Sequence, residues 1–432
     1  MHQKSSSMLA TIMDRRNIEK ALLQVERNKG VGGVDGMQID KLRDYLDINY
    51  QQLRKEVITG IYKPSPVEKV EIPKEEGGVR MLGIPTVIDR LLQQGISRWL
   101  SQYYEPYFSS FSYGFRPKKN AHQAVLQAQT FLNEGKSYVI ELDLEKFFDK
   151  VNHDKLMSLL MLKITDKGTL RFIREYLRSG IMEDGVVSQR IEGTPQGSPL
   201  SPLLSNIILD ELDKELSRRS LSFVRYADDY SIYVKSEKSA RRVLGSITKY
   251  IEKDLKLKVN KEKSKVSSPR ESTLLGFSFY KDRGAWAIRI SKKSIVRIKE
   301  KSKATTKRNS GSNTGQKILK MQTLIQGWVN YFSIAKAKSV MQKLDSCVRV
   351  RLRMCLWKEW KRCKTRTRNL LKLKASKQKS YEWGNSSKGY CRVAHSPILS
   401  TTLNNAYFIK QGYTGFYNTY KRLTNETQLS LF

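Results

Sequence analysis

Two adjacent aspartates lie between runs of β-branched and aromatic residues in the segment FVRYADDYSIYV, residues 223–234. Such residues favour strands, so the segment predicts a β-hairpin with Asp228 and Asp229 at its turn. A plain turn would account for the pair, because Asp tolerates turn conformations and can hydrogen-bond its own backbone. Two carboxylates at one edge of a sheet could instead bind a divalent metal ion. The rest of the chain has to distinguish these two interpretations.

The positive charge of the chain is concentrated in its last third. The 432 residues include 79 Lys and Arg against 42 Asp and Glu, a net charge of +37. Residues 281–432 alone hold 34 basic and 6 acidic residues, whereas the first 280 hold 45 and 36. A surface this positive binds polyanions with an affinity that falls as salt rises. Nucleic acid is therefore the expected partner, and the basic amphipathic helix beside an anchor that a membrane partner would need is not found.

The chain lacks the marks of a membrane or secreted protein. No run approaches the roughly 18 apolar residues of a membrane span, and the N-terminal segment MHQKSSSMLATIMDRR has no apolar signal-peptide core. We expect a cytoplasmic protein. The four cysteines, at positions 347, 355, 363 and 391, are too widely spaced for a CxxC zinc site or a disulfide framework.

The hydrophobic pattern predicts a mixed first part and a helical second part. Helices are expected over much of 1–60, around a glycine-rich loop at 28–36, then near 86–105 and 119–134 and over 238–255. Hairpins are expected at 67–85, 223–234 and 272–290. Residues 193–216 predict a loop and then an amphipathic helix, with Ser198 as its N-cap and Pro199 in its first turn. Beyond about residue 290 only helices are expected.

A third carboxylate is expected at the end of another strand. Nucleotide polymerisation is an in-line displacement at phosphorus that two Mg²⁺ ions about 4 Å apart can assist, and holding both ions takes two or three carboxylates on rigid strands. Asp143 closes the strand predicted in YVIELDL. The same side chain could instead cap a helix formed by the EKFF segment. Glu141, Glu145 and Asp149 are rival carboxylates that spacing alone does not dismiss.

Seven motifs occur in an order that resembles the group II intron reverse transcriptases: IPK…GGVRMLGIPTVIDRLLQ, SYGFRP, DLEKFF, TPQGSPLSPLLSN, YADD, LKLKVNKEKS and LLGFSF. The segment QGWVNYF, residues 326–332, and the basic helices around it resemble the maturase-specific thumb, domain X, of that family. Retron and diversity-generating enzymes depart from QGSPLSP, which favours the group II enzymes. The resemblance implies an α+β fold, a right-hand polymerase whose fingers and palm, with an antiparallel palm sheet, precede an α-helical thumb.

The resemblance also implies a division of the chain. Fingers and palm would span 1–288, the thumb or maturase domain 289–362, and a basic nucleic-acid-binding segment 363–432. Residues 1–60 would form an N-terminal extension whose loop at 28–36 closes over the template. An HNH nuclease is not expected, because it needs clustered His and paired Cys, and no DNA-cleaving activity is predicted.

Roles at the reaction centre follow from the resemblance. Asp143, Asp228 and Asp229 would be catalytic and would bind two Mg²⁺ ions, with Mn²⁺ as a substitute. Lys74 and Arg80, expected on the two arms of the 67–85 hairpin, would grip the incoming triphosphate. Their alternative is an ordinary exposed hairpin.

Further residues would contact the nucleotide and the template. Phe147 would lie under the deoxyribose and exclude a 2′-hydroxyl, with Phe148 as the alternative and core packing as the ordinary explanation of both. Gln196 and Gly197 would lie against the nucleotide, where glycine allows a close backbone approach. Arg116 would hold the template or the fingers, or else form a structural ion pair.

Two other contacts are implied nearer the thumb. Leu275, Gly276 and Phe277 would belong to a hairpin on the primer side. Lys263 is a candidate for the acid that protonates pyrophosphate.

The predicted function is an RNA-directed DNA polymerase that copies intron RNA from a DNA primer with dNTPs, and a maturase that binds the intron RNA to assist splicing. It would act in the bacterial cytosol, at the nucleoid when bound to DNA, and without a membrane partner. A splicing factor without polymerase activity is one alternative. A stand-alone reverse transcriptase used by its host in repair or defence is another.

Overall fold

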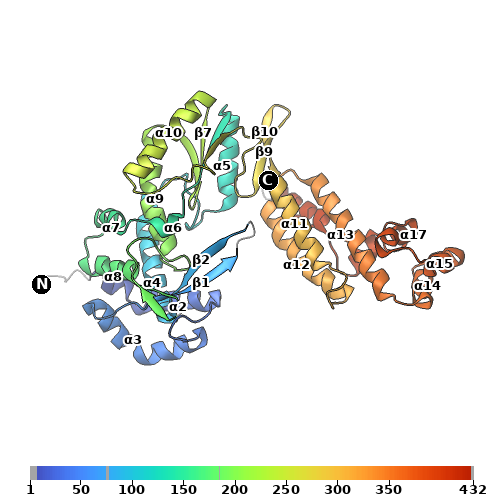
Figure 1. Ribbon diagram of the computed structural model, residues 1–432, viewed down its shortest axis with the longest axis horizontal. Helices are drawn as coiled ribbons and strands as arrows, with labels where there is room; N and C mark the ends of the chain where they lie inside the picture. Colours follow the sequence, from blue (N-terminus) through green and yellow to red (C-terminus); the bar gives the residue numbers. More distant parts are fainter. Residues whose placement is uncertain (1–6, 74–76, 184, 430–432) are drawn as a thin grey trace. The chain divides into compact units, whose positions relative to one another are not determined.

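The computed structural model describes residues 7–73, 77–183 and 185–429. The chain forms two compact units, the first ending at Ser268 and the second beginning at Pro269 (Figure 1). The 272–290 hairpin therefore belongs to the second unit, although the boundary of the functional domains was predicted at 288. The functional division into three domains stays a prediction. Among the described residues, no helix has the length and apolar character needed to cross a bilayer.

The first unit mixes helices with two four-stranded sheets. Its helices are α1 (Met8–Ile12), α2 (Arg15–Asn28), η1 (Ile39–Lys41), α3 (Leu42–Thr59), α4 (Val87–Tyr104), η2 (Glu105–Tyr107), α5 (Ala121–Asn133), α6 (Phe147–Lys150), α7 (His153–Met161), α8 (Lys167–Arg178), α9 (Ser201–Arg218) and α10 (Glu237–Lys253). Its strands are β1 (Val67–Pro73), β2 (Val79–Ile84), β3 (Tyr138–Leu142), β4 (Ile181–Glu183), β5 (Val186–Ser188), β6 (Ser222–Tyr226), β7 (Asp229–Val234) and β8 (Lys265–Ser267). The expected mixture of helices and strands is confirmed.

One sheet has the order β2-β1-β4-β5, in which β1 pairs antiparallel with β2 and parallel with β4. The predicted hairpin at 67–85 is confirmed by the pairing of β1 with β2. The short strands β4 and β5 were not predicted, because three residues carry too little alternation to be recognised.

The central sheet has the order β6-β7-β3-β8 and is antiparallel throughout. Its inner strands bury Val139, Ile140 and Ile232, and β6 buries Phe223 and Val224. Helix α10 packs against β3, β7 and β8, α5 against β6 and β7, and α9 against β6 (Figure 1). This covering of helices fixes the strands that carry the predicted carboxylates.

Helix α9 differs from its prediction in two ways. It begins at Ser201 after Leu200, so Ser198 is not the N-cap and Pro199 is not in the first turn. The Ser198 hydroxyl instead donates to Gln93 of α4 and accepts from the Leu200 amide. The helix is also buried on more than its apolar stripe, including Asp210 and Asp213, because strand β6 and helices α4 and α7 pack around it.

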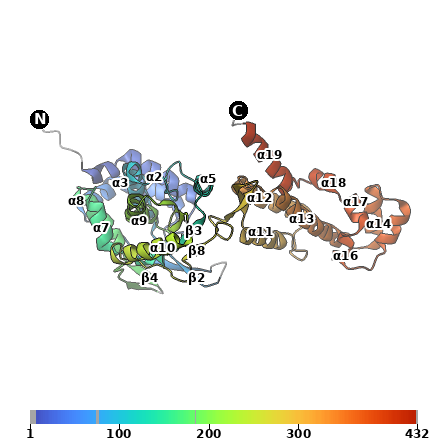
Figure 2. The ribbon, with the colours of Figure 1, turned by 90° about the horizontal axis from the view of Figure 1, so that it is seen from above.

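The second unit is a hairpin followed by helices. The hairpin strands are β9 (Phe277–Asp282) and β10 (Ala285–Ile290), and the helices are α11 (Lys292–Thr305), α12 (Thr314–Phe332), α13 (Lys338–Glu359), α14 (Cys363–Lys372), α15 (Lys377–Gly384), α16 (Tyr390–Ala394), α17 (Pro397–Thr402), α18 (Asn405–Lys410) and α19 (Phe416–Leu429). Helix α19 packs against α12 and α13 (Figure 2). The basic segment after residue 363 is thus folded into helices.

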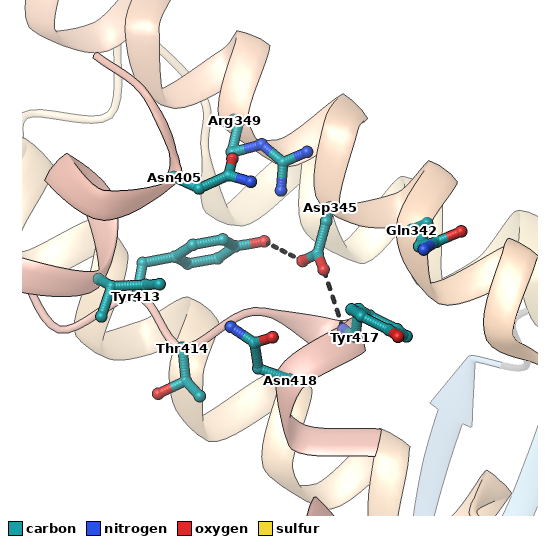
Figure 3. Close-up of a pocket in the computed structure, with 9 residues that line it drawn as sticks. Gln342, Asp345, Arg349, Asn405, Tyr413, Thr414, Tyr417 and Asn418 are labelled. Carbon is teal, nitrogen blue, oxygen red and sulfur yellow. Dashed lines mark hydrogen bonds between the residues drawn. The ribbon is translucent and has the colours of Figure 1, made fainter. Parts of the chain in front are cut away.

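Asp345 on α13 joins these helices to α19. Its Oδ1 accepts from the Tyr413 hydroxyl at 2.8 Å, and its Oδ2 accepts from the Tyr417 amide at 2.9 Å (Figure 3). The Oδ1 atom also accepts from the Phe416 amide at 2.7 Å. The carboxylate therefore satisfies amides at the beginning of α19, which a helix cannot satisfy itself. Beside it lies a polar cavity of about 370 Å³, lined also by Arg349.

Candidate active site

The two adjacent aspartates lie where strand β6 turns into strand β7. Tyr226 pairs with Asp229, so Ala227 and Asp228 form the two-residue turn. Ala227 has a φ of 57°, the left-handed conformation that tight hairpins require. The predicted hairpin is confirmed, and its turn presents both carboxylates at one edge of the central sheet.

The register of the sheet brings Asp143 to the same edge. The last pair between β3 and β7 is Leu142 with Tyr230. One further antiparallel step places Asp143 opposite Asp229. Hydrogen bonds at both polar groups fix the Asp143 backbone. Its amide donates to Ser264 Oγ at 3.0 Å, and its carbonyl accepts from the Asn260 amide at 2.9 Å and from the Ser264 hydroxyl at 3.3 Å.

Asp143 does not cap the short helix that follows it. Helix α6 begins at Phe147 after Lys146, and no side chain caps its first turn. The alternative explanation of Asp143 as an N-cap is therefore wrong. Among the rival carboxylates, Glu141 lies 3.4 Å from the Lys265 ammonium.

The three carboxylates influence one another. Desolvation by the surrounding protein, followed by the charges of Asp228 and Asp143, raises the pKa of Asp229 to about 6, although the residue reaches solvent. Desolvation also raises the pKa of Asp228, an effect that Asp143 increases and that Arg80 and Arg225 oppose. Concentrated negative charge of this kind is what a bound cation would neutralise.

The donor set suits a hard cation, although its ligand geometry is not preformed. Within the part of the chain that the structure describes, no three His, Cys, Asp or Glu side chains converge as a ready metal site. Mg²⁺ takes carboxylate oxygens, often only one or two from the protein, and completes its shell with water and substrate phosphates. Two adjacent carboxylates with a third across the sheet fit that chemistry.

A buried network below the turn was missed by the sequence analysis. Arg225 on β6 is fully buried and bonds Asp213 of α9 through Nε at 2.9 Å and Nη2 at 2.6 Å. Its Nη1 donates to Asn206 Oδ1 at 2.6 Å and to the Ala227 carbonyl at 3.1 Å. The Tyr230 hydroxyl donates to Asp213 at 2.9 Å. The guanidinium thus ties the turn to α9.

The segment around SYGFRP braces the other side of the turn. The Tyr113 amide donates to the Arg225 carbonyl at 2.8 Å, and Asn206 Nδ2 donates to the Gly114 carbonyl at 3.0 Å. The Arg116 side chain is 5% exposed and bonds Glu105 through two nitrogens. This contact favours the structural ion pair over a template contact for Arg116. Gly114 in the SYGFRP motif is the sequence feature that could have predicted this contact, because glycine allows a close backbone approach.

Two basic residues lie within electrostatic reach of the carboxylates. Lys263 Nζ is 3.9 Å from Asp143 Oδ2, and Arg80 on β2 lowers the pKa of Asp228. Lys74 lies outside the described residues. The role of this basic side in holding a triphosphate stays a prediction.

The residues expected around the nucleotide lie on two neighbouring segments. The side chain of Phe147 is 2% exposed within the core, whereas Phe148 is only partly buried, and their rings meet edge to face at 5.3 Å. The Gly83 amide donates to the Gln196 carbonyl at 2.8 Å. Gly197 has a φ of 108°, and a β-carbon there would lie 3.1 Å from the Gly83 carbonyl oxygen. Exposure therefore favours Phe148 over Phe147 as a surface contact.

Leu275, Gly276 and Phe277 lie in the second unit, against α12. The Tyr331 hydroxyl donates to the Leu275 carbonyl at 2.9 Å, and the Phe277 and Phe332 rings are 4.9 Å apart. Their contact with a primer stays a prediction.

Two family models match the chain. Residues 72–279 match the reverse transcriptase (RNA-dependent DNA polymerase) model, and residues 295–373 match the group II intron, maturase-specific domain. The matches cover the central sheet with its three aspartates and most of helices α11 to α14, in the order that the motifs predicted.

Curated relatives agree with these models. Protein YkfC of Escherichia coli is 32% identical over 272 residues, covering 54% of this chain and 71% of that protein. The group II intron-encoded protein LtrA of Lactococcus lactis is 35% identical over 201 residues, covering 46% of this chain and 33% of that protein. The putative COX1/OXI3 intron 2 protein of Saccharomyces cerevisiae is 29% identical over 294 residues, covering 54% and 34%.

The chain thus spans about two thirds of the first of these relatives and about one third of the two intron proteins. Among solved structures, a chain of a partial Cas6-RT-Cas1–Cas2 complex matches at 25% identity with a TM-score of 0.37, covering 58% of this chain and 43% of that one. The family matches and the identity to YkfC confirm the resemblance carried by the motifs. The chain therefore belongs to the reverse transcriptase and maturase family of group II introns, a family of RNA-directed DNA polymerases.

Proposed function

We propose that this chain copies intron RNA into DNA from a DNA primer, as a right-hand polymerase. The central sheet would be the palm, the β2-β1-β4-β5 sheet part of the fingers, and the helices from about residue 289 the thumb. The observation that carries the proposal is the antiparallel register that puts Asp143 opposite the Asp228 and Asp229 turn. A binding module would have no need of three carboxylates at one sheet edge, where they would repel nucleic acid.

Asp143, Asp228 and Asp229 would hold two Mg²⁺ ions, or Mn²⁺ in their place. Bound there, the ions would activate the primer hydroxyl and neutralise the charge of the leaving pyrophosphate. Arg225 Nη1 donates to the Ala227 carbonyl at 3.1 Å and so keeps the turn in place. The carboxylates are therefore positioned before the reaction begins.

Other side chains would bind and protonate the substrates. Arg80 would pair with the triphosphate, and Lys74 would join it. Lys263, with its Nζ 3.9 Å from Asp143 Oδ2, would hold the proton that the pyrophosphate takes up. Phe148 would pack under the sugar, supported by the buried Phe147, with Gln196 and Gly197 beside the base. Leu275, Gly276 and Phe277 would contact the primer.

The test is extension of a DNA primer on an RNA template with dNTPs and Mg²⁺. The rate of primer extension by the double variant Asp228→Asn, Asp229→Asn should fall about 10³-fold or more, because loss of the metal ligands removes several kcal/mol of transition-state stabilisation. Asp44→Asn, at an exposed position of α3, is the control and should extend normally. Extension by the double variant at the native rate would show that these carboxylates are not the metal ligands.

A second function, assistance of splicing by binding intron RNA, is supported by a different observation. Lys364, Arg368 and Lys372 are exposed and recur every four residues on α14, so they share one face of that helix. Such a row would lie along a phosphate backbone. Arg366 is separate, because its guanidinium lies 4.8 Å from the centre of the Trp357 ring.

The triple variant of Lys364, Arg368 and Lys372 to Gln should bind intron RNA more weakly. The slope of the logarithm of its binding constant against the logarithm of the salt concentration should be shallower by about two to three. Its primer extension on a short template should persist. The control neutralises Lys238, Arg242 and Lys249, an equally charged exposed set on α10. If both triple variants lose splicing equally, α14 is not a specific RNA contact.

A further inference from the structure

A basic cavity in the first unit contains more positive charge than the protein neutralises. It has a volume of about 430 Å³ and is lined by His153, Asp154, Arg174, Arg178, Gln189, Arg190 and Ile191. These residues come from α7, α8 and the segment after β5. Three guanidinium groups from two separate parts of the chain thus face one space.

The guanidinium of Arg190 is not satisfied by the protein. Its Nη1 is buried and has no hydrogen-bond partner among the described residues. Desolvation lowers the pKa of Arg190, and only the charge of Asp149 opposes that effect. A partly buried cation without a close partner is costly, and an anion in the cavity would relieve the cost.

The other charged groups of the cavity leave its excess positive. Asp154 lies 3.9 Å from Arg174, but its side chain is 90% exposed, so the pair is a weak surface contact. His153 Nε2 lies 2.7 Å from the Gly193 carbonyl and so carries its proton there. Burial lowers the pKa of His153, and the charges of Arg190 and Arg178 lower it further.

The surface beside the cavity suits a nucleic-acid strand better than a free anion. Ile191, which lines the cavity, is a large apolar side chain and yet is 87% exposed. Exposed apolar side chains next to arginines can contact bases while the arginines hold the backbone. A site for a small anion would gain nothing from them.

The segment that lines the cavity continues to the proposed nucleotide contacts. The Gly193 amide donates to the Val151 carbonyl at 2.8 Å, and the Thr194 amide donates to the Phe148 carbonyl at 2.6 Å. Gln196 follows two residues later. A strand lying in the cavity would therefore pass close to the site where the incoming nucleotide is paired.

We infer that Arg174, Arg178 and Arg190 bind a backbone phosphate of the uncopied, single-stranded RNA template. This inference rests on the proposed polymerase function, because the template ahead of the nucleotide is the strand that remains single. The guanidinium groups match phosphate geometry by paired N–H donors. The contact positions the template and reads no sequence.

The test is equilibrium binding without dNTPs, so that catalysis does not enter. The native chain should bind a primer–template with a ten-nucleotide 5′ RNA overhang more tightly than one with a two-nucleotide overhang. Arg178→Gln and Arg190→Gln should each remove most of that gain, about tenfold for a charge-assisted contact, and make the salt slope shallower by about one. Lys167→Gln, exposed at the other end of α8, is the control and should keep the gain.

Inorganic phosphate separates the two sources of the anion. If phosphate raises the melting temperature of the native chain but not of Arg190→Gln, and the overhang has no effect, the cavity takes a free anion and the template contact is refuted. An unchanged gain in both arginine variants also refutes it. A chain that binds neither primer–template would count against the polymerase function itself. Arg178 is exposed, so its variant tests the contact even if Arg190→Gln disturbs folding.

Discussion

Gly114 lies directly against the turn formed by Ala227 and Asp228: a β-carbon on Gly114 would be 2.2 Å from the Ala227 amide nitrogen. Gly114→Ala must therefore displace the turn, and we expect primer extension to fall about 100-fold, the size of a misplacement near 1 Å. Gly245 on α10 meets no atom within 4 Å. Gly245→Ala should keep full activity and gain about 0.5–1 kcal/mol of stability. Normal extension by Gly114→Ala would mean that the turn does not need this brace.

The ion pair of Arg225 with Asp213 is fully buried, with 2.6 Å between Nη2 and Oδ2. Asp213→Asn should lower the free energy of unfolding by about 3–5 kcal/mol, because the guanidinium loses its counter-ion. The double variant Arg225→Met, Asp213→Leu should cost less than the sum of the single changes. It should nevertheless extend primers slowly, because the bond to the Ala227 carbonyl is gone. Chemical denaturation and extension assays measure the two effects, and additive costs would disprove the coupling.

The strands that carry the carboxylates could be predicted because their patterns are local. The β-branched and aromatic residues of 223–234 are typical of strands, and the apolar residues of YVIELDL are typical of a buried strand. The positions of these strands could therefore be predicted from the sequence. Their meeting at one edge followed from the family resemblance, and the register of β3 with β7 agrees with it. Pairing between segments more than eighty residues apart depends on tertiary packing, which no local pattern specifies.

The features that the sequence did not predict have partners on other elements of the fold. Serine is a common N-cap residue, but the Ser198 hydroxyl donates a hydrogen bond to Gln93 on another helix, and α9 begins later, at Ser201. The partner of Arg225 is likewise on another element, twelve residues earlier. Strand β8 has only three residues and is stabilised by β3 rather than by its own pattern. In each case a contact outside the local window determines the outcome.

Phe148 and Phe147 differ in exposure, which gives opposite expectations for the two rings. Phe148→Val should raise the use of ribonucleotides, since the ring that would exclude a 2′-hydroxyl is trimmed. Phe147→Ala should instead destabilise the chain by about 3–5 kcal/mol through loss of core packing. The ratio of kcat/KM for dNTPs and rNTPs, with a thermal melt of each variant, distinguishes them. Relaxed selectivity in a Phe147 variant alone would reverse the assignment.

Glu215 on α9 gives a pH dependence of stability. Hydrogen bonds from Arg218, and then from Arg219, lower its pKa from 4.5 to about 2. The folded pKa lies below the unfolded one, so the stabilisation is present above about pH 4.5 and is lost as the pH falls toward 2. Glu215→Gln should be less stable than the native chain at pH 7, with a difference that shrinks in acid. Glu237→Gln, in an exposed pair with Arg241, should change little at any pH.

Asp345 should control the stability of the second unit without taking part in the reaction. In Asp345→Asn the side-chain nitrogen replaces Oδ2 and cannot accept from the Tyr417 amide. One hydrogen bond is lost, and two N–H donors then face each other. We expect the free energy of unfolding to fall by about 1–3 kcal/mol.

Gly415→Ala should destabilise the same contact, because its β-carbon would lie 2.7 Å from Asp345 Oδ1. Gly389→Ala is the control, because its β-carbon would meet no atom within 4 Å. Calorimetry should show the later helices melting earlier while extension on a short template persists at low temperature, because the carboxylates of the central sheet lie in the other unit. A loss of extension well below the melting transition would contradict that separation.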